Sequence, residues 1–401
     1  MMRICLVRLP SSFLINERAF PPLGLMTIGT ALKLKGHEVH IHDGLPEEVP
    51  LDYDYYGMGP TTPEYSFALA VKERVRNANP GARIVIGASF AALNRDRCLR
   101  DGWDCVVIGD GEMVVERAFA GSENLILSEE HPLDEYPIID RSILDLSLYH
   151  YQIDGRDATT LISSRGCPWR CSFCCKVDQR NTVRLRSAGH VIREIDYLHG
   201  LGYRALAFPD DIFILSRSRT EEICAHLKAL GMKWRCLVRA DIAVRYGQEF
   251  VQMMADSGCV DIGMGVESGS EKILKLANKG ETVATIKKAI VMLKAAGIRV
   301  KGFFILGLPG ETPETLSETD QFLLEMQLDD IDIKVYQPYP GSPIWQNKES
   351  LDIKWHDMEV AQMFYKGRTG EYYGNVSTGA LANNQIVEAM LRMEKAYKYA
   401  C

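Results

Sequence analysis

The sequence predicts an α/β protein made of two halves, in each of which short apolar runs alternate with amphipathic stretches. The chain has 401 residues, more than one hydrophobic core usually accommodates, so two domains and a tail are expected. Its 46% hydrophobic and 25% charged residues are the proportions of an ordinary globular protein. Strand-length runs interleaved with helical patterns are typical of parallel sheets covered by helices.

The first half is predicted to form a doubly wound parallel sheet. Five strand-length apolar runs lie at residues 3–9, 38–41, 54–58, 83–86 and 104–108. Helical patterns separate them at 23–35, 63–77 and 113–119, with a weaker one at 91–100. In such sheets ligands bind beyond the carboxyl ends of the strands, so the loops after these runs are the expected site.

The second half begins after a stretch of weaker periodicity at residues 134–149. Six further runs alternate with amphipathic helices, at residues 159–163, 204–208, 235–238, 260–266, 300–306 and 331–336. The repeat stops after Trp345, and the tail carries a helical pattern at 384–399 and the aromatic residues Trp355, Phe364, Tyr365, Tyr372 and Tyr373. We therefore expect a Rossmann-like domain over 1–133, a linker over 134–154, a second α/β domain over 155–344 and an extension over 345–401.

The most specific motif is a cysteine trio, Cys167, Cys171 and Cys174, in the spacing C-x3-C-x2-C directly after the run at 159–163. Three thiolates from one loop can hold three irons of a [4Fe–4S] cluster and leave the fourth iron without a protein ligand. The alternative is a structural zinc with Cys175 as fourth thiolate. A closed zinc site usually draws a second Cys or His pair from elsewhere in the chain, and the sequence has none with that spacing.

Eleven cysteines in a chain of this size indicate a reducing compartment and a metal centre rather than a disulfide framework. Those without ligand-like spacing are expected as small core or incidental residues: Cys5, Cys98, Cys105, Cys224, Cys236, Cys259 and Cys401. No apolar run approaches the roughly 18 residues that span a membrane, and Met1-Met2-Arg3 leads into a strand-like run without a signal-peptide layout. We therefore expect a cytoplasmic protein without a membrane span.

The formal net charge of -7 argues against a broad nucleic-acid footprint. A small-molecule or peptide substrate is therefore favoured over nucleic acid. A local basic strip follows the cysteine trio and is expected to be a solvated or substrate-facing loop rather than an RNA groove: Lys176, Arg180, Arg184 and Arg186.

With Phe173 just before its third cysteine, the trio resembles the signature loop of the radical SAM superfamily. The resemblance implies a [4Fe–4S] cluster that binds S-adenosylmethionine (SAM) at its unique iron and cleaves it to a 5′-deoxyadenosyl radical. It also implies a partial (β/α)6 barrel, and the six runs of the second half agree with that count. Catalytic residues of such barrels lie at the carboxyl ends of strands. We expect the tail to close the open side of the barrel.

Residues 1–120 resemble the cobalamin-binding domain attached to one branch of this superfamily. The resemblance rests on the order of the loops after the strands and implies cobalamin contacts from Pro22, Leu23, Gly24, Thr61, Thr62, Gly87, Ser89, Gly109, Gly111 and Glu112. The D-x-H-x-x-G signature that supplies a histidine to cobalt is absent, and His42-Asp43-Gly44 does not replace it. The lower cobalt ligand is therefore unassigned. The alternative is a degenerate Rossmann-like domain that binds no cobalamin.

In the second half, the stretches 266–270, 278–280, 302–311 and 338–343 also resemble the cobalamin-dependent branch. By this resemblance Glu267 and Ser268 would contact the SAM ribose or amino acid, and Arg239 or Lys279 its carboxylate. Phe173, Asp210 and Gly307 complete the expected cofactor contacts. A strand-end carboxylate that caps the next helix is the alternative for Glu267, and a plain turn is the alternative at Gly307.

Three residues are catalytic candidates: Asp211, Tyr336 and Tyr339. Asp210 and Asp211 could cap a helix, bind SAM or hold a substrate amine. The two tyrosines could face the substrate or donate hydrogen, although such tyrosines are often packing residues.

The leading hypothesis is a cobalamin-dependent radical SAM enzyme that methylates an unactivated carbon and receives electrons from an external flavodoxin or ferredoxin. The alternatives are a non-methylating radical rearrangement or oxidative cyclisation with the same cofactors, and a non-catalytic cobalamin or metal sensor. A tRNA methylthiotransferase is disfavoured, because that family carries a second cysteine trio and an RNA-binding module that are not seen here.

Overall fold

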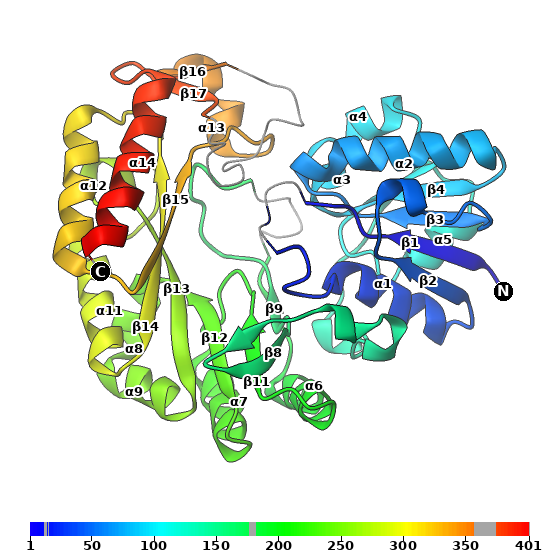
Figure 1. Ribbon diagram of the computed structural model, residues 1–401, viewed down its shortest axis with the longest axis horizontal. Helices are drawn as coiled ribbons and strands as arrows, with labels where there is room; N and C mark the ends of the chain where they lie inside the picture. Colours follow the sequence, from blue (N-terminus) through cyan, green and yellow to red (C-terminus); the bar gives the residue numbers. More distant parts are fainter. Residues whose placement is uncertain (12–13, 15, 176–181, 357–373, 401) are drawn as a thin grey trace. The chain divides into compact units, whose positions relative to one another are not determined.

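The computed structural model describes residues 1–11, 14, 16–175, 182–356 and 374–400. Its contacts divide the chain into two compact units, the first from Met1 to His150 and the second starting at Tyr151 (Figure 1). Within the described residues, no helix combines the length and the apolar character needed to cross a membrane.

The first unit contains a six-stranded parallel sheet in the order β2-β1-β3-β4-β5-β6. Its strands are β1 (Arg3–Val7), β2 (Glu38–His42), β3 (Tyr55–Met58), β4 (Arg83–Ile86), β5 (Cys105–Ile108) and β6 (Leu125–Leu127). This is the flavodoxin-like order, whose switch point lies between β1 and β3. The five predicted strands are present. The short β6 gave too brief an apolar run to be predicted.

Five helices accompany this sheet: α1 (Leu23–Leu34), α2 (Tyr65–Ala78), α3 (Ala88–Leu93), α4 (Arg95–Arg100) and α5 (Val115–Ala120). The weak pattern at 91–100 is two short helices, because Asn94 leaves the helical conformation and its side-chain amide bonds the carbonyl of Phe90. On one face of the sheet, Tyr65 stacks on Phe90 with ring centroids 3.8 Å apart. The Tyr65 hydroxyl also accepts a hydrogen bond from Trp103 Nε1.

The segment predicted as a linker is folded onto the first unit. It contains three 3-10 turns, Leu133–Glu135, Arg141–Ile143 and Leu146–Leu148. Lys33 on α1 pairs with Asp140 at 2.6 Å, and the Asp140 N–H donates to Thr30 Oγ1. Near the end of the segment, the Tyr149 hydroxyl donates to Asp43 at 2.7 Å. Residues 133–149 therefore have fixed contacts with α1 and the loop after β2.

The second unit contains a seven-stranded sheet in the order β15-β14-β13-β12-β11-β8-β7. Its strands are β7 (Gln152–Ile153), β8 (Arg156–Thr160), β11 (Ala205–Phe208), β12 (Lys233–Val238), β13 (Cys259–Glu267), β14 (Arg299–Leu306) and β15 (Asp330–Val335). All pairs are parallel except β7 with β8. The β7–β8 hairpin turns through Asp154 and Gly155, which both have positive φ (52° and 70°), as a two-residue type I′ turn requires.

The helices of the second unit alternate with its strands, with two helices after β12 and two after β13. They are α6 (Ala188–Gly200), α7 (Arg217–Ala229), α8 (Ala240–Tyr246), α9 (Gln248–Asp256), α10 (Glu271–Leu276), α11 (Val283–Ala295) and α12 (Pro313–Met326). The tail adds α13 (Pro343–Gln346), β16 (Ile353–Trp355), β17 (Val376–Thr378) and α14 (Asn383–Ala400), which corresponds to the predicted helix. Trp355 packs against Trp345 with centroids 4.7 Å apart. The predicted aromatics Phe364, Tyr365, Tyr372 and Tyr373 lie outside the described residues.

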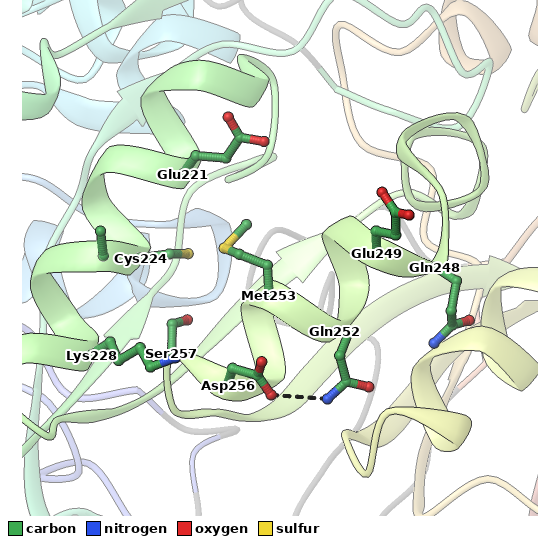
Figure 2. Close-up of a pocket in the computed structure, with 10 residues that line it drawn as sticks. Glu221, Cys224, Lys228, Gln248, Glu249, Gln252, Met253, Asp256 and Ser257 are labelled. Atoms are coloured by element: carbon green, nitrogen blue, oxygen red, sulfur yellow. Dashed lines mark hydrogen bonds between the residues drawn. The ribbon is translucent and has the colours of Figure 1, made fainter.

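A groove of about 600 Å³ runs between α7 and α9 on the outside of this unit. Cys224 on α7 and Met253 on α9 face each other across it (Figure 2), and Ala225 and polar side chains complete its lining. None of the residues predicted as functional lines this groove.

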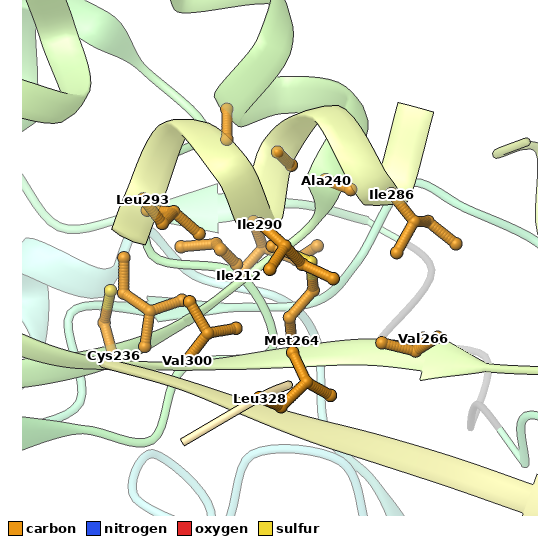
Figure 3. Packing of buried hydrophobic residues seen from close by; sticks show 14 of the residues in the cluster. Ile212, Cys236, Ala240, Met264, Val266, Ile286, Ile290, Leu293, Val300 and Leu328 are labelled. Carbon is orange, nitrogen blue, oxygen red and sulfur yellow. The ribbon is translucent and has the colours of Figure 1, made fainter. Parts of the chain in front are cut away.

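The core of the second unit lies between the sheet and its helices. Met264, Val266 and Val300 from the strands pack against Ile286, Ile290 and other α11 side chains (Figure 3). Their alternate neighbours, such as Gly263 and Gly265 on β13, face the other side of the sheet. The first predicted run, 159–163, is strand only as far as Thr160, because Asp210 binds the backbone N–H groups of Ser163 and Ser164.

Candidate active site

The cysteine trio lies on the loop that begins directly after β9 (Ser164–Arg165), a short strand that pairs with β10 (Arg184–Leu185). Cys171 is buried, and Cys167 and Cys174 are half-buried. Bonds to two helix ends hold this loop. The Ser172 N–H donates to the Ala277 carbonyl at 2.8 Å, and the Ile344 N–H donates to the Ser172 carbonyl at 3.0 Å. Loop position is therefore set by the end of α10 and the start of α13.

Three thiols on one fixed loop fit the donor set of a [4Fe–4S] cluster. Within the described ranges, no three His, Cys, Asp or Glu side chains are gathered around a single ion-sized site. A cluster does not need such convergence, because each thiolate binds a different iron. The other cysteines predicted as core residues are buried: Cys5, Cys98, Cys105, Cys224, Cys236 and Cys259.

Beside this loop, four buried charged residues form a chain of ion pairs at the ends of β12 and β13. Lys279 Nζ lies 2.9 Å from Glu267 Oε1 and 3.5 Å from Glu281 Oε2. Arg239 lies 3.5 Å from the same Glu281 oxygen and donates to the Lys279 carbonyl at 2.8 Å. We call Arg239, Glu267, Lys279 and Glu281 the charge chain. It brings together three of the predicted SAM contacts.

The pKa shifts follow from burial and pairing within the charge chain. Burial opposes the positive charge of Lys279, but the carboxylates of Glu267 and Glu281 outweigh it and hold its pKa above the usual value. Burial raises the pKa of Glu281, and the neighbouring Lys279 and Arg239 partly offset this. Burial also raises the pKa of the Cys171 thiol, while the cations Lys279 and Arg239 act to lower it. The charge chain is therefore electrostatically coupled to the cysteine loop.

A cation–π contact joins the charge chain to the cysteine loop. The Arg239 guanidinium lies 4.3 Å from the ring centroid of Trp169, which stands between the first two cysteines. The Asn278 side chain adds a hydrogen bond to the Arg170 carbonyl at 2.8 Å. Arg239 thus has a guanidinium that is already engaged by loop and carboxylate partners.

Glu267 sits in an unusual backbone conformation. It ends β13 with φ of 64°, a region that non-glycine residues rarely adopt and that often marks functional sites. Gly265, two residues earlier, leaves room for the ion pair, since a Cβ there would come within 2.9 Å of Lys279 Nζ and closer still to Glu267 Oε1. Ser268, the residue after Glu267, is fully buried. Its hydroxyl contacts Thr319 Oγ1 and accepts a hydrogen bond from the Ser270 N–H.

The two adjacent aspartates have different surroundings. Asp210 is buried and accepts hydrogen bonds from the Ser163 and Ser164 N–H groups and the Ser163 hydroxyl. Burial raises its pKa to about 6, against the lowering effect of those bonds. Asp211 is exposed. The structure therefore separates a buried, fully engaged carboxylate from one that a substrate could reach.

Two buried carboxylates that the sequence analysis did not select belong to this end of the sheet. Glu281 is central to the charge chain. Glu311 is fully buried, accepts the N–H of Gly307, and has one oxygen without a hydrogen-bond partner within the described residues. Burial raises the pKa of Glu311 to about 7. Gly307 itself has φ of 86°. A carboxylate directly after a Gly-containing loop, as in Lys279-Gly280-Glu281 and Pro309-Gly310-Glu311, is the signal that could have found both.

The tyrosines and Phe173 lie near the same strand ends. Tyr336 follows β15, is buried, and its hydroxyl has no hydrogen-bond partner among the residues the structure describes. Burial raises its pKa. Tyr339 and Phe173 are half-buried, and Phe173 packs against the core.

The predicted substrate-facing role of the basic strip is wrong for Arg186. This side chain is buried and pairs with Glu194 at 2.6 Å, because it packs under α6 rather than facing solvent. Lys176 and Arg180 lie outside the described residues, and Arg184 is half-buried.

In the first unit, the loops predicted to hold cobalamin follow four strands of the sheet. Pro22, Leu23 and Gly24 start α1 after β1, Thr61 and Thr62 follow β3, Gly87 and Ser89 follow β4, and Gly109, Gly111 and Glu112 follow β5. The buried Thr61 Oγ1 has no hydrogen-bond partner in the part of the chain described. An added Cβ at Gly24 would meet nothing within 4 Å. An unsatisfied hydroxyl and open backbone fit a ligand-binding edge.

Comparison with known proteins identifies the class. Residues 161–323 match the Radical SAM superfamily, so the chain contains a radical SAM domain and the predicted superfamily is confirmed. The chain is 28% identical over 398 residues to an uncharacterized methyltransferase of Pyrococcus horikoshii, covering 88% of this chain and 85% of the relative. It is 27% identical over 371 residues to the anaerobic magnesium-protoporphyrin IX monomethyl ester cyclase of Cereibacter sphaeroides, covering 82% of this chain and 60% of that enzyme.

The fold is similar to a solved structure of the same superfamily. The radical S-adenosylmethionine methyltransferase TsrM from Kitasatospora setae, solved with cobalamin and a [4Fe–4S] cluster bound, superposes with a TM-score of 0.73 at 16% identity. The superposition covers 98% of this chain and 91% of TsrM. The predicted fold class, a doubly wound domain followed by a partial barrel, is confirmed.

Proposed function

We propose that this protein is a cobalamin-dependent radical SAM methyltransferase that methylates an unactivated carbon. The observation that carries the proposal is the junction of the cysteine loop with the charge chain through Arg239 and Trp169. It sets a three-thiol donor set beside two buried carboxylates and two buried cations near the carboxyl ends of barrel strands. These are the groups that a zwitterionic SAM molecule requires.

In this proposal the chain's residues have distinct roles. Cys167, Cys171 and Cys174 would hold the cluster. Glu267 would accept hydrogen bonds from the ammonium or ribose of SAM, while Lys279 holds the Glu267 carboxylate in place. The exposed Asp211 would be free to contact a substrate cation, and the buried Tyr336 hydroxyl would meet the substrate or stay a packing group.

The first unit would hold cobalamin against the loops that contain Thr61, Gly87 and Gly109, with no histidine assigned below cobalt. When bound, the cluster supplies the electron for reductive cleavage of SAM, and cobalamin carries the methyl group. An external donor of the flavodoxin or ferredoxin type would reduce the cluster, and a cytoplasmic setting suits such oxygen-sensitive groups. Small molecules or peptides are the proposed substrate class.

A second function with the same cofactors is favoured by one comparison. The similarity to the magnesium-protoporphyrin cyclase extends over 82% of this chain, and that enzyme is named for ring closure rather than methyl transfer. The fate of the SAM methyl group distinguishes the two reactions, because only methyl transfer carries it into the product.

The first test is reconstitution under anaerobic conditions with iron, sulfide and hydroxocobalamin, followed by analysis of iron, zinc and cobalt. We expect about four irons and one cobalt per chain. Incubation with reductant and methyl-labelled SAM should give 5′-deoxyadenosine and, when candidate small-molecule or peptide acceptors are supplied, a labelled product. Unlabelled product with 5′-deoxyadenosine would instead support cyclisation or rearrangement, and iron without cobalt would leave a radical SAM enzyme of another reaction class.

Two neighbouring cysteines supply a matched control. Cys171→Ala should abolish the cluster and SAM cleavage while cobalamin binding persists. Cys175→Ala should keep both, because the proposed donor set does not include it. Loss of iron from the Cys175 variant would support a four-thiolate site.

A further inference from the structure

The segment from Ile162 to Ser164 leads from β8 into the cysteine loop without belonging to the main sheet. It reaches Cys167 through Arg165 and Gly166, which has φ of 92°. Any displacement of this segment therefore moves the first cysteine of the trio. Its backbone groups are held mainly by side chains from later in the chain.

Asp210 holds the N–H side of the segment. One carboxylate oxygen accepts from the Ser163 N–H at 2.7 Å and the Ser164 N–H at 3.2 Å, and the other accepts from the Ser163 hydroxyl. The side chain is 1% exposed. Both oxygens of Asp210 are therefore used on the segment, and neither is directed to a ligand.

Two arginines hold the carbonyl side. Arg219 donates to the Ser163 carbonyl at 2.8 Å and, through Nε, to the Arg186 carbonyl at 2.6 Å. Arg186 donates to the Ile162 carbonyl at 2.7 Å and pairs with Glu194. We call Asp210, Arg219 and Arg186 the collar of the segment.

The collar consists of buried ionic groups, and burying charged side chains has a cost in free energy that something must offset. Buried ion pairs often stabilise a fold less than apolar side chains of similar volume would, so their value is frequently geometric. Here Asp210 and Arg186 satisfy backbone groups of Ile162, Ser163 and Ser164 beyond the end of β8. Arg219 adds a second donor to the Ser163 carbonyl, which also accepts from the Arg186 N–H at 3.0 Å. A buried backbone donor without a partner is costly, so the collar favours one path of the segment over others.

We propose that Asp210, with Arg219, is a positioning residue for the first cluster cysteine and not a SAM ligand. This inference rests on the proposed function, since it concerns the path of the loop that would hold the cluster. It reassigns Asp210, which the sequence analysis placed among the SAM contacts, and it leaves Asp211 as the accessible member of the pair.

The test compares Asp210→Ala, Asp210→Asn and Asp211→Ala as full-length, reconstituted proteins. The readouts are iron per chain, the rate at which a chelator bleaches the cluster, and the electron paramagnetic resonance (EPR) spectrum of the reduced cluster with and without SAM. We expect chelator bleaching about tenfold faster in Asp210→Ala, which corresponds to a barrier to cluster loss that is about 1.4 kcal/mol lower. The exposed Asp211→Ala should match the wild type in these cluster readouts.

Asp210→Asn should restore cluster retention, because its amide oxygen can still accept both N–H groups while Ser163 accepts from its NH₂. Its EPR spectrum should still change on addition of SAM. Normal cluster retention in Asp210→Ala would overturn the proposal. So would an Asp210→Asn protein with a normal cluster whose spectrum no longer responds to SAM.

If Asp210→Ala does not fold, Arg219→Lys provides the second measurement. A lysine cannot bridge the Ser163 and Arg186 carbonyls with a rigid fork, so faster bleaching is again expected, and an unchanged rate counts against the collar. Failure of the proposed function would be recognised separately in the wild type itself, which would then take up no cluster or no cobalamin.

Discussion

Replacement of Lys279 by methionine tests the charge chain most directly. Lys279 is 4% exposed and pairs with both Glu267 and Glu281. Without it, Glu281 keeps Arg239 as a partner at 3.5 Å, but Glu267 becomes a buried carboxylate without a cation. Removing one member of a buried pair typically costs about 3–5 kcal/mol. For a unit of this size, that corresponds to a fall of roughly 10 °C in Tm.

The assay is chemical denaturation of the protein before cofactor loading, with Lys275→Met as control. Lys275 lies on the exposed side of α10, so its replacement should change the free energy of unfolding by less than about 0.5 kcal/mol. Adding Glu267→Gln to Lys279→Met removes the stranded charge and should recover part of the loss. A Lys279→Met protein within about 1 kcal/mol of wild type, or a double variant no more stable than the single one, would refute the reasoning.

Two further substitutions probe the same end of the sheet. The pKa of Glu311 is raised to about 7, so the folded protein binds a proton at this carboxyl more tightly than the unfolded chain does. The stability that this proton contributes is fully present below the usual carboxyl pKa and is lost as the pH rises toward 7. Urea denaturation should show wild type losing about 3 kcal/mol relative to Glu311→Gln across that window, and parallel pH profiles would contradict the assignment. Gly265→Ala should displace the Glu267–Lys279 pair and lower the free energy of unfolding by about 1–3 kcal/mol. The control is Gly189→Ala on α6, where an added Cβ would meet nothing within 4 Å, so this variant should be as stable as wild type or more stable. Equal effects of the two substitutions would show that Gly265 is not needed for space.

Much of the fold was predictable because it depends on local periodicity. The strand runs and the cysteine spacing are properties of neighbouring residues, and both are found where predicted. The path of the chain after Thr160 was not predictable. Its apolar run continues to Ser163, yet Asp210, 47 residues after Ser163, takes the backbone donors that a longer strand would use.

In the candidate site, too, residues marked by the local sequence were predictable and residues that depend on distant partners were not. Glu267 and Lys279 could be selected because they follow a strand and a helix in a recognisable order. Glu281 was not selected: the Gly280-Glu281 sequence marks a carboxylate after a loop, but its role depends on Arg239, 42 residues away, in the 3.5 Å contact. Arg186 looked like part of a basic surface strip until its partner Glu194 was known. Sequence reasoning is weakest for charged residues, whose burial depends on partners from other elements.

The hairpin of β7 and β8 has a practical consequence for isolating the radical SAM half. β8 is paired with β11 on one side and with β7 on the other. A fragment that starts at residue 155, the predicted boundary, would leave that flank of β8 as a bare edge able to pair with another molecule. A fragment that starts at Tyr151 keeps the two-residue β7 and its Asp154-Gly155 turn, together with the bond from Arg235 to the Tyr151 hydroxyl at 2.8 Å. Four residues at the amino terminus would thus decide whether the isolated half stays monomeric or self-associates through strand pairing.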